Sequence, residues 1–200
     1  MNTFEFQLHF QLPESETDPE AWLDALFEAG CDDALIGVAA QGYLSLDFSR
    51  DAAAAWNALQ TAVEDVKKAI PEARLVSAGP DLLNLSELAE LLSERLVKVT
   101  RQAMRKYAKG EVKKVTTRFP SPRVSGGTPL WHADDVLGWM TENHKIRQQA
   151  ADRAAALRAL TSATRTLNST KEYQQSRTTN PDLEPTAEHI MAACKPMPTL

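Results

Sequence analysis

Apolar and polar residues alternate from Phe4 to Leu12, so that five apolar side chains share one face of the segment. This period of two predicts a strand with one buried face. A helix should follow, because Asp18-Pro19 combines an N-cap residue with proline at the first helical position, and Gly30 is placed to end the helix. The apolar positions of this helix are Trp22, Leu23, Leu26 and Phe27.

Two strands and a second helix are predicted next. Residues 34–38 and 43–48 have the composition of strands and flank Gln41-Gly42, which is typical of a hairpin turn. The alanine-rich stretch from Arg50 to about Ile70 then predicts a helix. Its larger apolar side chains recur at helical spacing, at Trp56, Leu59, Val63 and Val66.

A short strand at 74–77 is predicted to end this part of the chain, and Ala78-Gly79-Pro80 is expected to interrupt it. We therefore expect a linker near Ser77–Asp81 and a first domain at residues 1–78. The order strand–helix–strand–strand–helix–strand predicts an α+β domain with a ferredoxin-like sheet and both helices on one face. That fold alone says little about function.

Two more helices are predicted after the linker. Ser86 is expected to be the N-cap of the first, which continues to about Leu96, and Thr100 the N-cap of the second, which covers 100–109. The apolar positions expected to face inward are Leu88, Ala89, Leu91 and Leu92 in the first helix and Ala103, Met104 and Tyr107 in the second.

The remainder of the chain is more polar. A stretch rich in turn residues and proline fills 110–129, and a further helix should begin near Ala133, with Asp134-Asp135 as its cap. Residues 143–167 keep a helical pattern, but their apolar stripe is thin and alanine-rich, which predicts an exposed or loosely associating helix. The polar, proline-containing residues 168–200 predict a flexible tail.

The composition is that of a globular protein. The 200 residues are 43% hydrophobic and 24% charged, which excludes general disorder and fits one large or two small domains. No apolar run reaches the ~18 residues of a membrane helix, and the first residues lack the pattern of a signal peptide, so we expect a soluble cytoplasmic protein with no membrane contact. Cys31 and Cys194 are too few for a disulfide framework or a four-cysteine metal site.

The net charge of −5 hides a division into an acidic and a basic part. Residues 1–80 carry fourteen acidic and four basic side chains, a net −10, and residues 81–200 carry thirteen and eighteen, a net +5. Between Arg95 and Arg123 there are ten basic side chains and one acidic side chain, Glu111. This local +9 indicates that the two parts have different partners and favours nucleic acid for the basic one.

The polar side of the predicted helix 100–109 has the chemistry of DNA recognition. Four side chains opposite its apolar positions project together, namely Arg101, Gln102, Arg105 and Lys106. In the major groove, arginine binds guanine O6 and N7 and glutamine pairs with adenine N6 and N7, while other cations contact phosphates. The sequence therefore predicts a DNA-reading helix.

The order of these parts resembles the winged helix-turn-helix of the MerR/excisionase type. After the two helices come Phe119–Val124, Gly126–Trp131 and Asp134–Trp139, which match the proline-rich entry, glycine tip and following helix of that family's hairpin wing. The resemblance covers about Asp81–Met140. One difference is that the segment 92–100 between the helices is longer than the tight turn of such proteins by roughly one helical turn.

The resemblance implies a DNA-binding domain at 81–142 that reads the major groove with helix 100–109 and has a wing around 119–130. It assigns recognition to Thr100, Arg101, Gln102, Arg105 and Lys106, and wing contacts to Arg123, Ser125, Gly126, Gly127 and Thr128. The other cations of the basic segment that we expect at the DNA are Lys109, Lys113, Lys114 and Arg118.

No arrangement of residues predicts catalysis, a cofactor or a metal site. The histidines lack the spacing of metal ligands, and His132 is expected at the surface beside the wing. Trp131 and Trp139 are expected to fill the core, and Cys31 to be a small buried apolar side chain. Gly126-Gly127 predicts a turn, because the lysine and hydroxyl residue of a phosphate loop do not follow it. We expect no enzymatic activity.

These features predict a sequence-specific double-stranded DNA-binding protein, most simply a transcription regulator that acts as a homodimer. We expect it to be cytoplasmic and nucleoid-associated, as in bacteria or phages. One alternative is an antitoxin-like interaction protein whose acidic domain at 1–78 binds a basic protein partner and which uses DNA binding for autoregulation. A further alternative is an excisionase-like factor that bends DNA.

Overall fold

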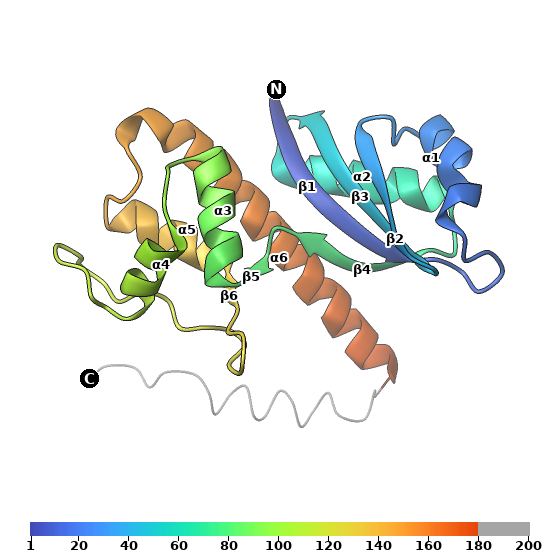
Figure 1. Ribbon diagram of the computed structural model, residues 1–200. Coiled ribbons are helices and arrows are strands. Elements are labelled where there is room, and N and C mark those ends of the chain that lie inside the picture. Colours follow the sequence, from blue (N-terminus) through green and yellow to red (C-terminus); the bar gives the residue numbers. More distant parts are fainter. Residues whose placement is uncertain (180–200) are drawn as a thin grey trace. The chain divides into compact units, whose positions relative to one another are not determined.

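A four-stranded antiparallel sheet forms the first half of the chain. Its strands are β1 (Asn2–Gln11), β2 (Ala34–Ala40), β3 (Tyr43–Ala52) and β4 (Arg74–Gly79), in the order β2-β3-β1-β4. The structure is a computed structural model that describes residues 1–179, except the side chains of 38–40 (Figure 1). Residues 1–165 form one compact unit, and a second unit begins at Thr166.

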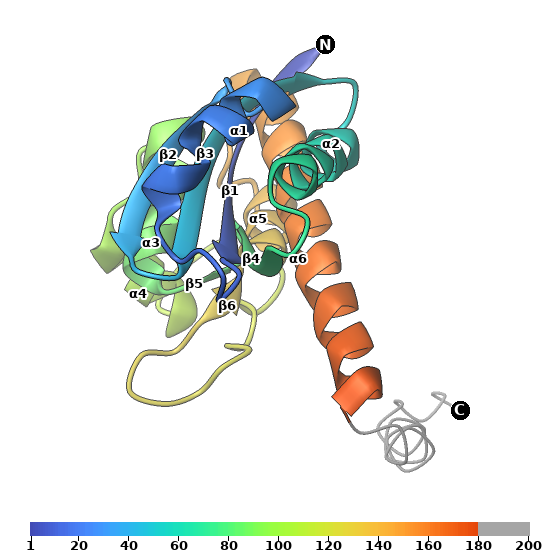
Figure 2. The ribbon, with the colours of Figure 1, turned by 90° about the vertical axis from the view of Figure 1, so that its right-hand side faces the viewer.

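Helices cover one face of this sheet (Figure 2). They are the short 3₁₀ helix η1 (Pro19–Trp22), α1 (Leu23–Ala29) and α2 (Ala55–Ala69). The alternating apolar residues of β1, Phe4 to Leu12, are all buried on that face. Asp18 accepts a hydrogen bond from the Glu20 amide as N-cap, and Gly30 ends α1 with φ +110°. These features confirm the predicted α+β class.

Several predicted boundaries and positions are wrong. The helix predicted from Arg50 begins only at Ala55, because β3 continues to Ala52 and pairs with β1 over its whole length. Trp56 is 45% exposed and Phe27 is 67% exposed, although both were predicted on apolar helix faces. In α1 the buried side chains are those of Leu26 and Ala29, because α1 is short and packs against α2.

Arg50 is buried on the helix-covered face, where an apolar residue would be expected. Its guanidinium donates two hydrogen bonds to Asp33, at 2.8 and 2.9 Å, and one to Asp65 at 2.7 Å. It also donates to the Thr61 hydroxyl at 3.1 Å and the Gly30 carbonyl at 2.8 Å. Burial lowers the pKa of Arg50, but the hydrogen bonds and charges of the two aspartates outweigh this effect and raise it. The guanidinium thus ties α1, β2, β3 and α2 together.

The second half contains mostly helices. Its elements are β5 (Leu82–Leu83), α3 (Leu85–Arg95), α4 (Arg101–Ala108), β6 (Trp131–His132), α5 (Ala133–Glu142), the 3₁₀ helix η2 (Gln148–Ala150) and α6 (Ala151–Thr179). The strands β5 and β6 pair antiparallel, which brings the residues before α3 next to the residues before α5. Within residues 1–179, no helix is both long enough and apolar enough to cross a membrane.

The linker predicted near Ser77–Asp81 is ordered structure instead. β4 continues to Gly79, which is the register partner of Gln7 on β1, so only Pro80 and Asp81 separate it from β5. Asp81 is buried, and the Pro80 carbonyl accepts a hydrogen bond from the Thr164 hydroxyl at 2.7 Å. These contacts hold the segment in place although its sequence is typical of a break.

The helix predicted over 143–167 also differs from the structure. His144 has a positive φ of 52°, so the chain turns after α5, and α6 begins at Ala151 and continues to Thr179, beyond the predicted start of the tail. The first part of α6 is not loosely associated, because one side of it is buried at Ala154, Leu157, Leu160, Thr161 and Thr164. Small side chains on that stripe permit close packing. Residues 180–200 of the predicted tail lie outside the described part.

Replacing Arg50 by alanine should destabilise the protein by about 3 kcal/mol, because two partly buried carboxylates lose their counter-charge. Urea unfolding measures this change. The control Arg74→Ala removes an exposed cation from β4 and should change stability by less than about 0.5 kcal/mol. Equal effects of the two substitutions would contradict the role given to Arg50.

Cys31 is buried as predicted, and burial raises the pKa of its thiol to about 11, with a further contribution from Asp65. Because the pKa in the folded protein lies above the ordinary value of 9.0, the contribution of the neutral thiol to the free energy of unfolding is fully present below pH 9. It is lost as the pH rises towards 11. In a Cys194→Ser chain, iodoacetamide at pH 8 should label the urea-unfolded protein and leave the native one unlabelled. Rapid labelling of the native chain would contradict this.

Candidate nucleic-acid interface

The N-terminus of α3 is held by a reciprocal cap. Asn84 accepts hydrogen bonds from the amides of Ser86 at 2.8 Å and Glu87 at 3.2 Å, and the Glu87 carboxylate accepts one from the Asn84 amide at 2.8 Å. The prediction of Ser86 as N-cap is therefore wrong, because Leu85 is already helical. The inward positions are confirmed as buried, at Leu88, Ala89, Leu91 and Leu92.

The loop between α3 and α4 is fixed by side chains from both ends. The Ser93 hydroxyl donates to the Val99 carbonyl at 2.8 Å and accepts from the Val99 amide at 3.1 Å. Thr100 is the N-cap of α4, as predicted, and its hydroxyl accepts from the Ala103 amide at 3.2 Å. The start of α4 is therefore held firmly against α3, although five residues separate the two helices.

One side of α4 packs against the protein and the other faces outward. Met104 is fully buried, and the Tyr107 ring lies 5.2 Å from the ring of Trp139. The outward side carries the exposed polar side chains Arg101, Gln102, Arg105 and Lys106. Within the described residues, none of these three cations has a carboxylate partner within ion-pair distance.

An aromatic cluster supports α4 and the segment after it. Phe119 packs edge-on against Trp131 at 6.3 Å and Trp139 at 5.1 Å between ring centroids. The Trp131 indole donates to the Pro120 carbonyl at 2.9 Å, and the Trp139 indole to the Thr117 carbonyl at 3.0 Å. Both tryptophans are buried, which confirms the prediction that they fill the core. Their polar N–H groups anchor the proline-rich segment.

Asn143 is a buried polar residue that is not among those predicted from the sequence. Its carbonyl oxygen accepts from the amide of Thr116 at 2.7 Å and from the hydroxyl of the same residue at 3.1 Å. Its NH₂ group donates to the Thr117 hydroxyl at 3.0 Å and the Trp139 carbonyl at 2.9 Å. Asn143 thus holds the segment with Lys113 and Lys114 against α5. An asparagine at the end of a predicted helix was the available signal.

The wing region is a loop closed by a β-bridge between Val124 and Leu130. The Leu130 amide donates to the Val124 carbonyl at 3.0 Å, and the Arg123 amide donates to the Leu130 carbonyl at 2.7 Å. Gly126, at the tip, has φ +152°, a conformation that favours glycine. Residues 125–128, which lie between the two bridge residues, are exposed.

His132 and Asp81 form a buried pair at the end of this loop. The His132 Nδ1 and an Asp81 oxygen lie 2.6 Å apart, and the Ala133 amide donates to the Asp81 carbonyl at 2.8 Å. The prediction of His132 as a surface residue is therefore wrong. The pairing of Leu82 with His132 places the imidazole inside, next to a residue 51 positions away in the sequence.

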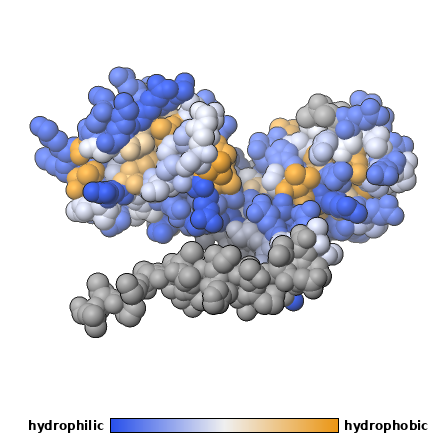
Figure 3. Space-filling view, turned by 90° about the horizontal axis from the view of Figure 1, so that it is seen from below, coloured by the Kyte–Doolittle hydropathy of each residue, from blue (hydrophilic) through white to orange (hydrophobic). Residues whose placement is uncertain are grey.

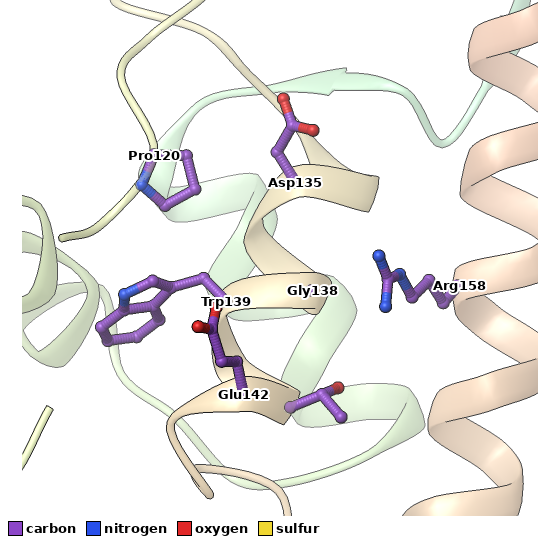
Figure 4. A pocket seen from close by; sticks show the side chains of 7 residues that line it. Pro120, Asp135, Gly138, Trp139, Glu142 and Arg158 are labelled. Carbon is purple, nitrogen blue, oxygen red and sulfur yellow. The ribbon is translucent and has the colours of Figure 1, made fainter. Parts of the chain in front are cut away.

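Asp134 and Asp135 do not cap α5, contrary to prediction, because His132 holds the N-cap position without a side-chain bond. Asp134 pairs with Arg158 at 3.3 Å, and Asp135 pairs with Arg165 at 2.7 Å. Figure 4 shows Arg158 reaching from α6 towards Gly138 on α5, across a hollow of about 540 Å³. Both acidic and basic side chains line this hollow, and the two ion pairs connect α5 to α6.

All of the residues predicted at the DNA are exposed. They are Thr100, Arg101, Gln102, Arg105, Lys106 and Lys109 on α4 and its ends, Lys113, Lys114 and Arg118 in the following segment, and Arg123, Ser125, Gly126, Gly127 and Thr128 in the wing. Lys109 lies 4.0 Å from Glu111 in an exposed pair. On the side drawn in Figure 3, apolar side chains reach the surface only in small separate areas.

Comparison with known proteins adds no assignment, because no family model, curated protein or solved structure matches the chain. Among residues 1–179, no group of three or more histidine, cysteine, aspartate or glutamate side chains is placed to hold a metal ion.

Asn143→Ala should destabilise the protein by about 2 kcal/mol, because it removes the partly buried hydrogen bonds that the buried Asn143 makes with Thr116 and Thr117. Urea unfolding measures the change, and Asn57→Ala, at an exposed asparagine of α2, should have an effect below about 0.5 kcal/mol. If Asn143→Ala leaves stability unchanged, Asn143 does not anchor the segment.

Proposed function

We propose that this chain is a sequence-specific double-stranded DNA-binding protein, most simply a transcription regulator. The observation that carries the proposal is the arrangement of α4. One side of the helix is packed through Met104 and Tyr107, and the other presents exposed cations and Gln102 without ion-pair partners in the described residues. A DNA-reading helix needs this division into a packed and a free side.

The free side chains have the donors that read base edges. In this proposal, Arg101 or Arg105 binds guanine O6 and N7 with two hydrogen bonds, and Gln102 pairs with adenine. Lys113 and Lys114 lie on the adjoining segment that Asn143 fixes, and they supply phosphate contacts. The local charge of +9 gives the long-range attraction to DNA.

The surrounding elements support a winged helix-turn-helix of the MerR/excisionase type for residues 81–142. The pairing of β5 with β6 and the bridge from Val124 to Leu130 support a wing beside α4. For residues 1–78, the order of elements and the strand order β2-β3-β1-β4 support a ferredoxin-like sheet. The homodimer and the basic protein partner of this acidic half stay predictions.

Substitutions on α4 and in the following segment test this function. A binding site is first selected from random duplexes with the full-length protein, and affinities are then measured by fluorescence anisotropy. Arg101→Ala or Arg105→Ala should cost about 1–3 kcal/mol on the selected site and little on random DNA. Lys113→Ala should weaken both similarly, because a phosphate contact carries no sequence information.

The matched control is Arg74→Ala, which removes an exposed cation from β4 and should leave both affinities unchanged. Failure to enrich any sequence, or an equal loss for Arg74→Ala and Arg105→Ala, would overturn the proposed function. Equal losses on selected and random DNA for Arg101 and Arg105 would show that they contact phosphates.

A further inference from the structure

A hollow lined by three cations lies beside the loop between α3 and α4. Its volume is about 270 Å³, and its charged lining residues are Lys98 from the loop, Arg147 before η2 and Arg153 in the first turns of α6. Gln149 adds a neutral polar side chain, and no acidic residue lines the hollow. In Figure 1 the start of α6 comes next to the loop after α3 in this region.

These cations differ from their neighbours on α6 because they have no counter-charge. Arg158 pairs with Asp134, and Arg165 pairs with Asp135. In the described part of the chain, none of the three cations of the hollow has a carboxylate within 4 Å. Like charges around one hollow repel, and a bound anion would relieve that repulsion.

The chemistry of the lining favours a phosphate group. Arginine forms paired hydrogen bonds to phosphate oxygens, and lysine adds a compact charge with three donors. The amide end of α6 contributes partial positive charge of the same sign. Asp152 lies in the first turn of α6, but it is exposed and does not line the hollow.

We propose that this pocket binds a phosphate of the DNA backbone, next to the bases that α4 reads. The inference rests on the proposed function. Lys98 lies two residues before Thr100, the N-cap of α4. The pocket is therefore close to the N-terminal end of α4, which carries Arg101 and Gln102. The DNA contact thus extends to residues 147–153, beyond the region with the winged-helix pattern, and anchors the strand outside the wing.

The test uses the full-length protein with Arg147→Gln and Arg153→Gln combined. Both side chains are exposed and make no ion pair in the described structure, so the fold should be unchanged, as circular dichroism and thermal melting can verify. The matched control combines Lys68→Gln with Arg74→Gln, which removes the same charge from exposed positions on α2 and β4.

Affinity for random and selected duplexes is measured between about 50 and 200 mM salt. Each neutralised phosphate contributes about 0.9 to the slope of log K against log salt, so loss of the phosphate bound in the pocket should reduce the slope by about 1. It should also lower the affinity for selected and random DNA by the same factor, because phosphate contacts do not read sequence. The control should change neither.

An unchanged slope in the Arg147/Arg153 double variant would overturn the inference while the proposed function stands. Absence of DNA binding by the unsubstituted protein would overturn both. A second measurement tests whether the pocket binds free phosphate. The melting temperature is compared in millimolar inorganic phosphate and in chloride at equal ionic strength. If the pocket binds free phosphate, phosphate should raise the melting temperature of the unsubstituted protein but not that of the double variant. That result together with an unchanged DNA slope would replace the DNA backbone by a small phosphate as the ligand.

Discussion

The short antiparallel pairing of Leu82–Leu83 with Trp131–His132 is the contact on which the second half depends. It joins the start of α3 to the end of the wing loop, and the buried Asp81–His132 pair lies directly at this junction. Because Trp131 is part of the same strand, its indole can reach the Pro120 carbonyl and close the loop from inside. Together with the packing of Tyr107 and Phe119 against Trp139, this pairing places the wing loop and α4 on the same part of the fold.

Some cations of this protein form ion pairs with carboxylates, and others have no such partner in the described residues. Arg50 is enclosed by Asp33 and Asp65, where it stabilises the first half. Arg95 contacts the Glu5 carbonyl at 2.8 Å and its carboxylate at 3.3 Å, so one cation of the basic segment already has a partner in the acidic half. The cations of α4 and of the hollow beside it have no carboxylate partner in the described residues, so their charge is left to attract an anionic ligand.

Local patterns predicted individual elements well where the interactions that form the element connect residues close in the sequence. The alternation after Phe4 defined β1, and the hydroxyl of Thr100 capped α4 as expected. The amphipathic spacing around Met104 also placed the free side of α4 correctly, because burial of one helix face exposes the other. Boundaries failed where pairing continued past a break signal, as in β4, which continues to Gly79.

The sequence by itself determined the α+β class, the charge division and which side of α4 is exposed, because these follow from composition and from periods of a few residues. Only the tertiary structure decided the Asp81–His132 pair, the hydrogen bonds between Asn143 and residues 116–117, and the grouping of Lys98 with Arg153. The residues in these contacts lie about 25 to 55 positions apart, so no local spacing indicates them. Strand pairing and helix packing bring them together, and the buried polar atoms must then find partners.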